Sequence, residues 1–159
     1  MTSGQDSPSP PREGEVARSA DWIAHLSSSA AAWREEAALV LGDWLYPRGG
    51  MSDAEVLTIH QALLDAALRE IDEDACCAQL NALTRSNRAL VGVTGWDRLV
   101  ERAPDLPSEP QELALALLSI SGEPAFADRL EALALERAEF DHALTRKTIA
   151  GIRASAGDG

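Results

Sequence analysis

Apolar residues recur at intervals of three and four over most of the chain, which is the spacing of amphipathic helices. The clearest case is SDAEVLTIHQALLDAALREID, residues 52–72, where a capping box of Ser52 and Glu55 predicts the start of a helix. The apolar side chains that follow share one helical face. They are Val56, Leu57, Leu63, Leu64, Ala67, Leu68 and Ile71. We therefore predict a helix with one buried face over this segment.

Proline, glycine and capping residues divide the neighbouring sequence into further helices. A short helix is expected after Ser19, and a second one is expected with a serine cap near Ser29 and an end at PRGG, residues 47–50. After the acidic residues 72–74 the helical pattern resumes and runs to about Arg85. The pattern leaves open whether the helix continues through the acidic residues or bends there.

In the C-terminal half, the apolar pattern predicts more helices after a less regular stretch. PQELALALLSISG, residues 110–122, is apolar on most sides, which is typical of a central helix, and Gly122 ends it. Pro124 opens the last segment, which runs to about Ala154 as one helix or as two divided near Glu139. The predicted fold class is therefore all-α, an irregular helical bundle of about five to seven helices.

Composition supports this fold class and indicates the domain boundaries. Hydrophobic residues make up 45% of the 159 residues and aromatic residues only 4%, so residues that favour strands are scarce. Residues 1–18 are rich in serine, proline, glycine and charge, which predicts a disordered N-terminal tail. A single helical domain is expected over residues 19–154, followed by a disordered C-terminal end, residues 155–159.

Charge and hydropathy exclude several classes of partner. The formal net charge of −12 repels nucleic-acid phosphates and anionic lipid. No apolar run approaches the roughly 20 residues that span a bilayer, and the N-terminus is polar where a signal peptide is apolar. The only cysteines, Cys76 and Cys77, are adjacent, which fits a reducing compartment. We predict a cytoplasmic protein that binds neither nucleic acid nor membrane.

His60 lies in the middle of the apolar face of residues 52–72, so its ring is expected in the core. A histidine that accepts a phosphoryl group must instead be exposed, usually with a lysine or a carboxylate nearby. The phosphotransfer pattern has lysine and glycine at the positions of Leu63 and Leu64 here. We predict a hydrogen-bonded histidine in the core or in a self-association face, with phosphoryl transfer at His60 as the alternative.

Neither the histidines nor the cysteines have the spacing of a metal site. His25, His60 and His142 are far apart in sequence, and we interpret Cys76 and Cys77 as small buried or half-buried apolar residues. No metal, cofactor or catalytic residue is predicted.

An acidic cluster lies at the end of the segment that contains His60. Its members are Glu70, Asp72, Glu73 and Asp74. The cluster lacks the alternating ligands and the glycine of a calcium loop, so we interpret it as a solvated surface.

Two tryptophans are candidates for contact with a partner protein, because large exposed aromatic residues are enriched in binding hot spots. Trp22 lies near the N-terminal tail, and Trp96 lies in the irregular segment VTGWDRL. The alternative for each is an anchor in the core.

Three segments together resemble a bacterial domain family of unknown function that is built from HEAT-like helical repeats. They are AALVLGDWLYPRGG, SDAEVLTIHQALLDAALREID and DACCAQLNALTRSN, and the resemblance covers about residues 35–120. Where that family has an acidic residue, this chain has His60. The resemblance implies a short HEAT-like helical array that serves as a scaffold for protein contacts, without catalytic residues to transfer.

The predicted function is that of a non-catalytic cytoplasmic module for protein–protein interaction or regulation. Its partner is expected to be another protein, and a homodimer is left open. The alternatives are a histidine-phosphotransfer or kinase-dimerisation module that uses His60, and a helical bundle that binds a small molecule.

Overall fold

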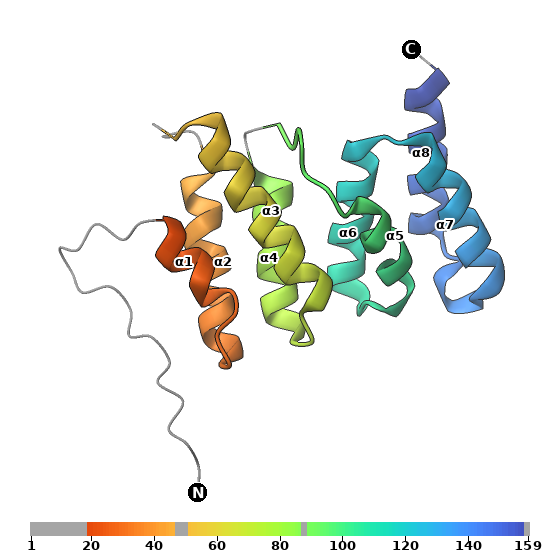
Figure 1. Ribbon diagram of the computed structural model, residues 1–159. Helices are drawn as coiled ribbons and strands as arrows, with labels where there is room; N and C mark the ends of the chain where they lie inside the picture. The colour runs from red at the N-terminus through yellow and green to blue at the C-terminus, as the bar shows by residue number, and fades with distance from the viewer. Residues whose placement is uncertain (1–18, 47–50, 87–88, 158–159) are drawn as a thin grey trace, which may run out of the picture. The chain divides into compact units, whose positions relative to one another are not determined.

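The described part of the chain consists of helices and connecting turns. The computed structural model describes residues 19–46, 51–86 and 89–157, and within them it contains eight α-helices, two short 3-10 helices and no strand (Figure 1). The predicted all-α fold class is confirmed. The described helices group into two compact units, within residues 1–91 and 92–159, where the sequence predicted one domain over residues 19–154. Each unit is described by itself.

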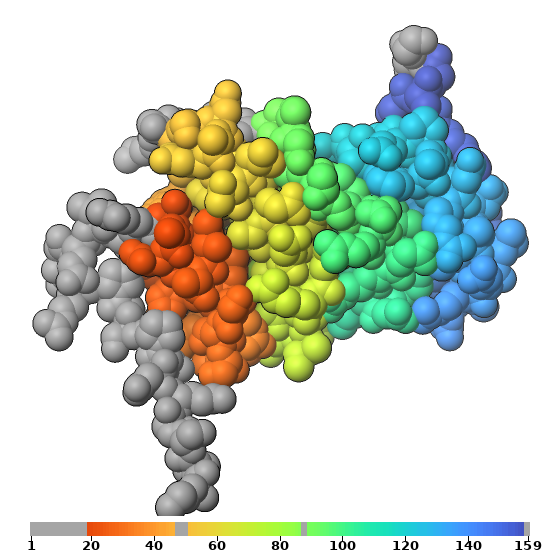
Figure 2. Space-filling model, viewed as in Figure 1, coloured from red at the N-terminus to blue at the C-terminus, as the bar shows by residue number. Residues whose placement is uncertain are grey.

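Unit 1 contains the first four helices, α1 (Ser19–His25), α2 (Ala31–Trp44), α3 (Asp53–Arg69) and α4 (Glu73–Arg85). Helix α2 packs against α1 and α4, while α3 packs against α4 and α1. Figure 2 shows the atoms of α1 and α2 in red and orange beside the yellow and yellow-green atoms of α3 and α4. Leucine and isoleucine side chains at most 1% exposed fill the interior between these helices. They are Leu26, Leu41, Leu45, Ile59, Leu63, Leu64, Leu80 and Leu83.

A glycine allows α2 and α4 to approach closely. A Cβ atom built on Gly42 in α2 would lie 3.1 Å from the Cβ of Ala82 in α4. Such a separation is tighter than ordinary van der Waals contact, so a larger residue at either position would push the two helices apart.

Unit 2 contains α5 (Trp96–Arg102), α6 (Ser108–Ser121), α7 (Pro124–Glu136) and α8 (Ala143–Gly157), with 3-10 helices η1 (Ala103–Asp105) and η2 (Ala138–Phe140). Helices α5 and α8 each pack against both α6 and α7. The interior is again aliphatic, with one large aromatic ring. Its most buried members include Leu99, Leu115, Leu117, Leu118, Leu130, Phe140 and Ile152.

Local capping explains three of the helix ends. Ser52 Oγ accepts the N–H of Glu55 at 3.2 Å, so Ser52 begins α3 as the predicted N-cap. Gly122 ends α6 with a φ of 64°, in the left-handed region that glycine adopts without strain. Asp72 Oδ1 accepts the N–H of Ala75 at 2.9 Å and begins α4. The chain therefore breaks at residues 70–72 instead of continuing as one helix.

The structure corrects two predicted boundaries and decides a third that the sequence left open. The cap near Ser29 is wrong, because the residue before α2 is Ala30, whose N–H donates to Ser28 Oγ at 3.3 Å. The last segment is two helices, α7 and α8, separated by η2. Helix α8 extends to Gly157, three residues past the predicted end of the domain. The predicted N-terminal tail, residues 1–18, lies outside the described residues.

No helix in the described part of the chain combines the length and the apolar character that crossing a membrane requires.

Candidate functional site

The two tryptophans predicted to contact a partner lie mostly inside the protein. Trp22 in α1 and Trp96 at the start of α5 are each 8% exposed. Trp22 contacts the ring of His25 at a centroid distance of 5.4 Å, and His25 stacks on Trp33 at 5.6 Å. This burial is what the core-anchor alternative expects, and it leaves little indole surface for a partner.

His60 occupies the core of unit 1, as its position on the apolar face predicts. Its side chain is fully buried, and Nε2 lies 2.7 Å from Ser86 Oγ, at the end of α4. The prediction of a hydrogen-bonded core histidine is confirmed. A phosphoryl donor would have to reach a ring with no exposed surface, so the position of His60 does not favour the phosphotransfer alternative.

The other candidate ligands are not gathered into a metal site. Among the described residues, no group of three or more histidine, cysteine or acidic side chains is placed to hold a metal ion. Cys76 is buried and Cys77 is half-buried, as predicted. His142 serves a structural contact in unit 2, where its Nε2 donates to Gln111 Oε1 at 2.7 Å.

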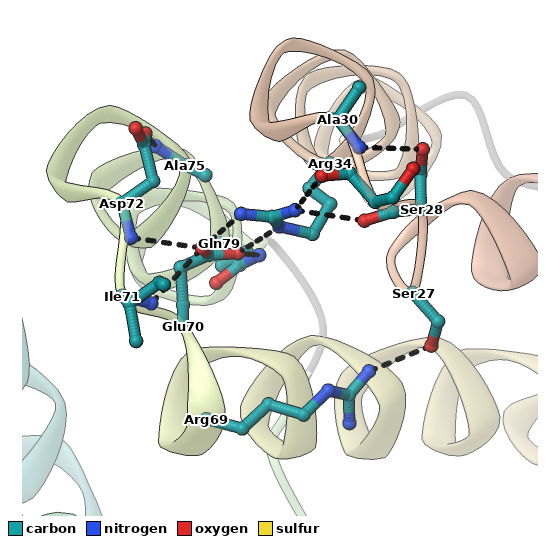
Figure 3. Close-up of polar contacts among 11 residues, drawn as sticks. Ser27, Ser28, Ala30, Arg34, Arg69, Glu70, Ile71, Asp72, Ala75 and Gln79 are labelled. Carbon is teal, nitrogen blue, oxygen red and sulfur yellow. Dashed lines mark hydrogen bonds and ion pairs between the residues drawn. The ribbon is translucent and has the colours of Figure 1, made fainter. Parts of the chain in front are cut away.

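A buried ion pair that the sequence did not predict joins two turns of unit 1 (Figure 3). Arg34 in α2 binds the carboxylate of Glu70 with both arms, from Nε to Oε2 at 2.8 Å and from Nη2 to Oε1 at 2.9 Å. The side chains of Arg34 and Glu70 are 16% and 2% exposed. Arg34 Nη1 also donates to the carbonyl oxygens of Ser28 and Ser29, in the turn between α1 and α2.

The same carboxylate fixes the turn between α3 and α4. Glu70 ends α3 in an extended conformation, and its Oε1 accepts the backbone N–H groups of Ile71 (3.1 Å) and Asp72 (3.0 Å). Its Oε2 accepts a hydrogen bond from Gln79 Nε2 at 2.9 Å. We call Arg34, Glu70 and Gln79 the Glu70 cluster. The cluster holds the turn of residues 70–72 in one conformation because its polar bonds act largely away from water.

The charge state of the Glu70 cluster follows from these contacts. Burial of the carboxyl group would by itself raise its pKa, because burial disfavours the charged form. The hydrogen bonds from Arg34, the Asp72 backbone and Gln79, with the positive charge of Arg34, outweigh burial and lower the pKa of Glu70 from 4.5 to about 2. The hydrogen bond to Glu70 also raises the pKa of Arg34 above its usual value. Both groups are therefore charged at neutral pH.

The interpretation of the acidic cluster as a solvated surface is wrong for Glu70. Glu70 is 4% exposed, whereas Glu73 and Asp74 are exposed and Asp72 caps α4. The partner of Glu70 lies 36 residues earlier in the chain, and no spacing rule connects the two positions.

Ile71 is also placed differently from the prediction. The helical period predicts it on the buried face of residues 52–72, but α3 ends before it and its side chain is 94% exposed. Once the chain leaves the helix, the 3.6-residue period no longer determines which way a side chain points.

A cavity of about 270 Å³ lies beside this turn. We call it the small cavity. It lies between the α1–α2 turn and the α3–α4 turn, and its lining combines apolar, hydroxyl and charged groups. The lining residues are Leu26, Ser27, Ser28, Arg34, Arg69, Glu70 and Ile71.

A larger cavity of about 510 Å³ lies beside the start of α3. Its volume is in the usual range for small-molecule sites, roughly 300–1,000 Å³. Its lining has one ionisable side chain, Asp53, and the others are apolar: Ala54, Val56, Leu57, Ala89 and Val91. Leu57 and Val91 are 37% and 79% exposed, so these walls would enclose a ligand poorly.

Comparison of the chain with protein-family models, curated proteins and solved structures finds no match. The resemblance to the HEAT-like family of unknown function stays a prediction.

Proposed function

We propose that the protein is a non-catalytic, cytoplasmic module for protein–protein interaction, and that a partner protein binds at the turn between α3 and α4. The observation that carries this proposal is the side chain of Ile71, which is 94% exposed although its backbone N–H is bonded to the buried carboxylate of Glu70. An isolated exposed apolar residue is common on protein surfaces. What distinguishes Ile71 is that its backbone is fixed and a cavity lies next to it.

A fixed turn favours binding for an entropic reason. Association costs free energy for every flexible segment that must be ordered at the interface. The Glu70 cluster orders residues 70–72 before any partner arrives, so this cost is reduced. Covering an exposed isoleucine then contributes roughly 1.5–3 kcal/mol of favourable burial.

Affinity purification of the tagged full-length chain from the cells that make it tests this proposal. We expect a partner protein at constant stoichiometry with the wild-type chain and a loss of most of it with Ile71→Ala. The matched control is Ile120→Ala at the end of α6, because Ile120 is also exposed, at 60%. Retention of the partner by Ile71→Ala, or equal loss from the control, would contradict the proposed surface.

Light scattering on the purified chain separates the proposal from self-association. A homodimer that dissociates in Ile71→Ala but not in Ile120→Ala would identify the partner as a second copy of this chain. Recovery of a monomer without any partner would count against an interaction module.

A further inference from the structure

The positive charge of the small cavity comes from one side chain, Arg69. Arg34 and Glu70 both line the cavity, but they neutralise one another in a two-armed ion pair. Arg69 at the end of α3 is exposed, and its Nη2 donates to Ser27 Oγ at 3.0 Å. Among the described residues, no carboxylate forms an ion pair with Arg69.

Arg69 retains hydrogen-bonding capacity beyond its contact with Ser27. A guanidinium group carries five N–H donors in a planar fork that matches a carboxylate. The hydroxyl groups of Ser27 and Ser28 lie at the same cavity and accept bonds from Arg69 and from the Ala30 N–H, so each can still donate its own proton. The cavity wall is therefore rich in donors.

The surroundings limit how much negative charge a ligand can carry. Asp72, Glu73 and Asp74 follow Ile71 directly, and the last two are exposed. A strongly acidic segment would be repelled by these carboxylates, whereas one carboxylate at Arg69 would be attracted at short range. The apolar surface of Ile71, on the same cavity, favours an aliphatic group beside that carboxylate.

The volume of the cavity leaves room for an inserted side chain. About 270 Å³ is below the usual range for small-molecule sites, which begins near roughly 300 Å³. Such a space has room for an Asp or Glu side chain that a partner inserts while the rest of its segment lies on the surface.

We propose that the small cavity binds one aspartate or glutamate side chain of a partner segment through Arg69 and Ser27, with a neighbouring aliphatic residue of that segment packed on Ile71. This inference rests on the proposed function and names the chemistry of its partner. It predicts that Arg69 decides which segment binds, while Ile71 contributes to binding whatever the charge of the segment.

Selection from random peptides displayed on phage, with the full-length protein as bait, tests the inference. We expect enriched peptides to pair Asp or Glu with a large aliphatic residue. Fluorescence anisotropy of synthetic, labelled peptides with amidated C-termini then gives their dissociation constants. Replacement of the acidic residue by its amide should weaken binding roughly tenfold to a hundredfold.

Variants of the protein assign the contacts. Arg69→Ala should lower the affinity for the enriched acidic peptides by the same factor, so that this variant binds the acidic and amide peptides equally. Ile71→Ala should lower the affinity for both peptides roughly tenfold. The matched control is Arg85→Ala in the last turn of α4, which removes a positive charge from an exposed position of the same unit. Ile120→Ala is the control for Ile71→Ala. Both controls should bind as the wild type does, and circular dichroism checks that every variant is folded.

The remaining outcomes separate the two proposals. Some peptides could need Ile71 for binding and yet bind Arg69→Ala as they bind the wild type. That result would contradict the inference of an acidic partner segment, but it would not contradict the proposed function. If Arg85→Ala lowers the peptide affinity as much as Arg69→Ala does, the loss comes from the net charge of the protein and not from a contact at Arg69. That result would also contradict the inference. Absence of any enriched peptide that depends on Ile71 or Arg69 would contradict both proposals.

Discussion

Two arginines, one in each unit, make ion pairs of similar length in very different surroundings. In unit 1, Arg34 binds Glu70 at 2.8 Å, with side chains 16% and 2% exposed. In unit 2, Arg153 binds Asp128 at 2.9 Å and Glu131 at 2.6 Å, but these three side chains are 44%, 78% and 50% exposed. Both arrangements join segments more than twenty residues apart in the chain.

The comparison shows that distance alone does not determine what an ion pair contributes. Water competes for the charges of Arg153 and screens them, so this contact adds little to stability. The Glu70 carboxylate has almost no access to water and depends on Arg34, Gln79 and two backbone N–H groups. Removing a partner there leaves a charge that water cannot reach easily.

Glu70→Ala is expected to have the largest effect. It removes the acceptor for Arg34, Gln79 and the turn of residues 70–72, and breaking a buried pair in this way costs roughly 3–5 kcal/mol of unfolding free energy. Urea unfolding followed by the fluorescence of the four tryptophans, three of them in α1 and α2 of unit 1 and Trp96 in unit 2, measures the loss in either unit. Glu131→Ala is the control, and a loss of similar size in the control would remove the distinction between buried and exposed pairs.

A pH series sharpens the same contrast. The folded-state pKa of Glu70, about 2, is below its ordinary value of 4.5, so its charge stabilises the fold fully above about pH 4.5 and loses that effect as the pH falls toward 2. The difference of about 2.5 units corresponds to roughly 3 kcal/mol. Urea unfolding of the wild type and of Glu70→Gln between pH 6 and pH 2.5 should show their stabilities converging at low pH. A constant difference across this range would mean that the charge of Glu70 does not carry the effect.

The smallest effect is expected for Arg153→Ala. Its charge lies at an exposed surface, so hydrogen exchange of the α7 and α8 amides at neutral pH should match that of the wild type within error. Protection factors that fall throughout unit 2 would show that the exposed contacts hold its helices together, contrary to the comparison.

Features with a local physical cause were predictable from the sequence. Ser52 and Glu55 mark the start of α3, Gly122 ends α6 and Pro124 begins α7, because capping and backbone preferences act within one helical turn. The burial of His60 followed from its place in the helical period.

Features of the candidate site were not predictable in this way. Arg34 and Glu70 have no motif in common, and Glu70 stands among acidic residues that are exposed, so its sequence context indicated solvent. A signal for the end of α3 was present in Asp72, which caps α4, and that break also accounts for the exposure of Ile71. Only the path of the chain after the break determines where either side chain lies.

The sequence by itself determined an acidic, helical protein with the capped start of α3, the glycine end of α6 and the apolar faces that its helices bury. These properties depend on residues within a few positions of one another, where backbone geometry and side-chain period act directly. Tertiary structure alone decided that Glu70 is buried against Arg34, that Ile71 is exposed on a fixed turn, and that Arg69 and Ser27 lie at one cavity. The physical reason is that desolvation and ion pairing depend on separations in space, and packing brings together residues such as Ser27 and Arg69, which are 42 positions apart in the chain.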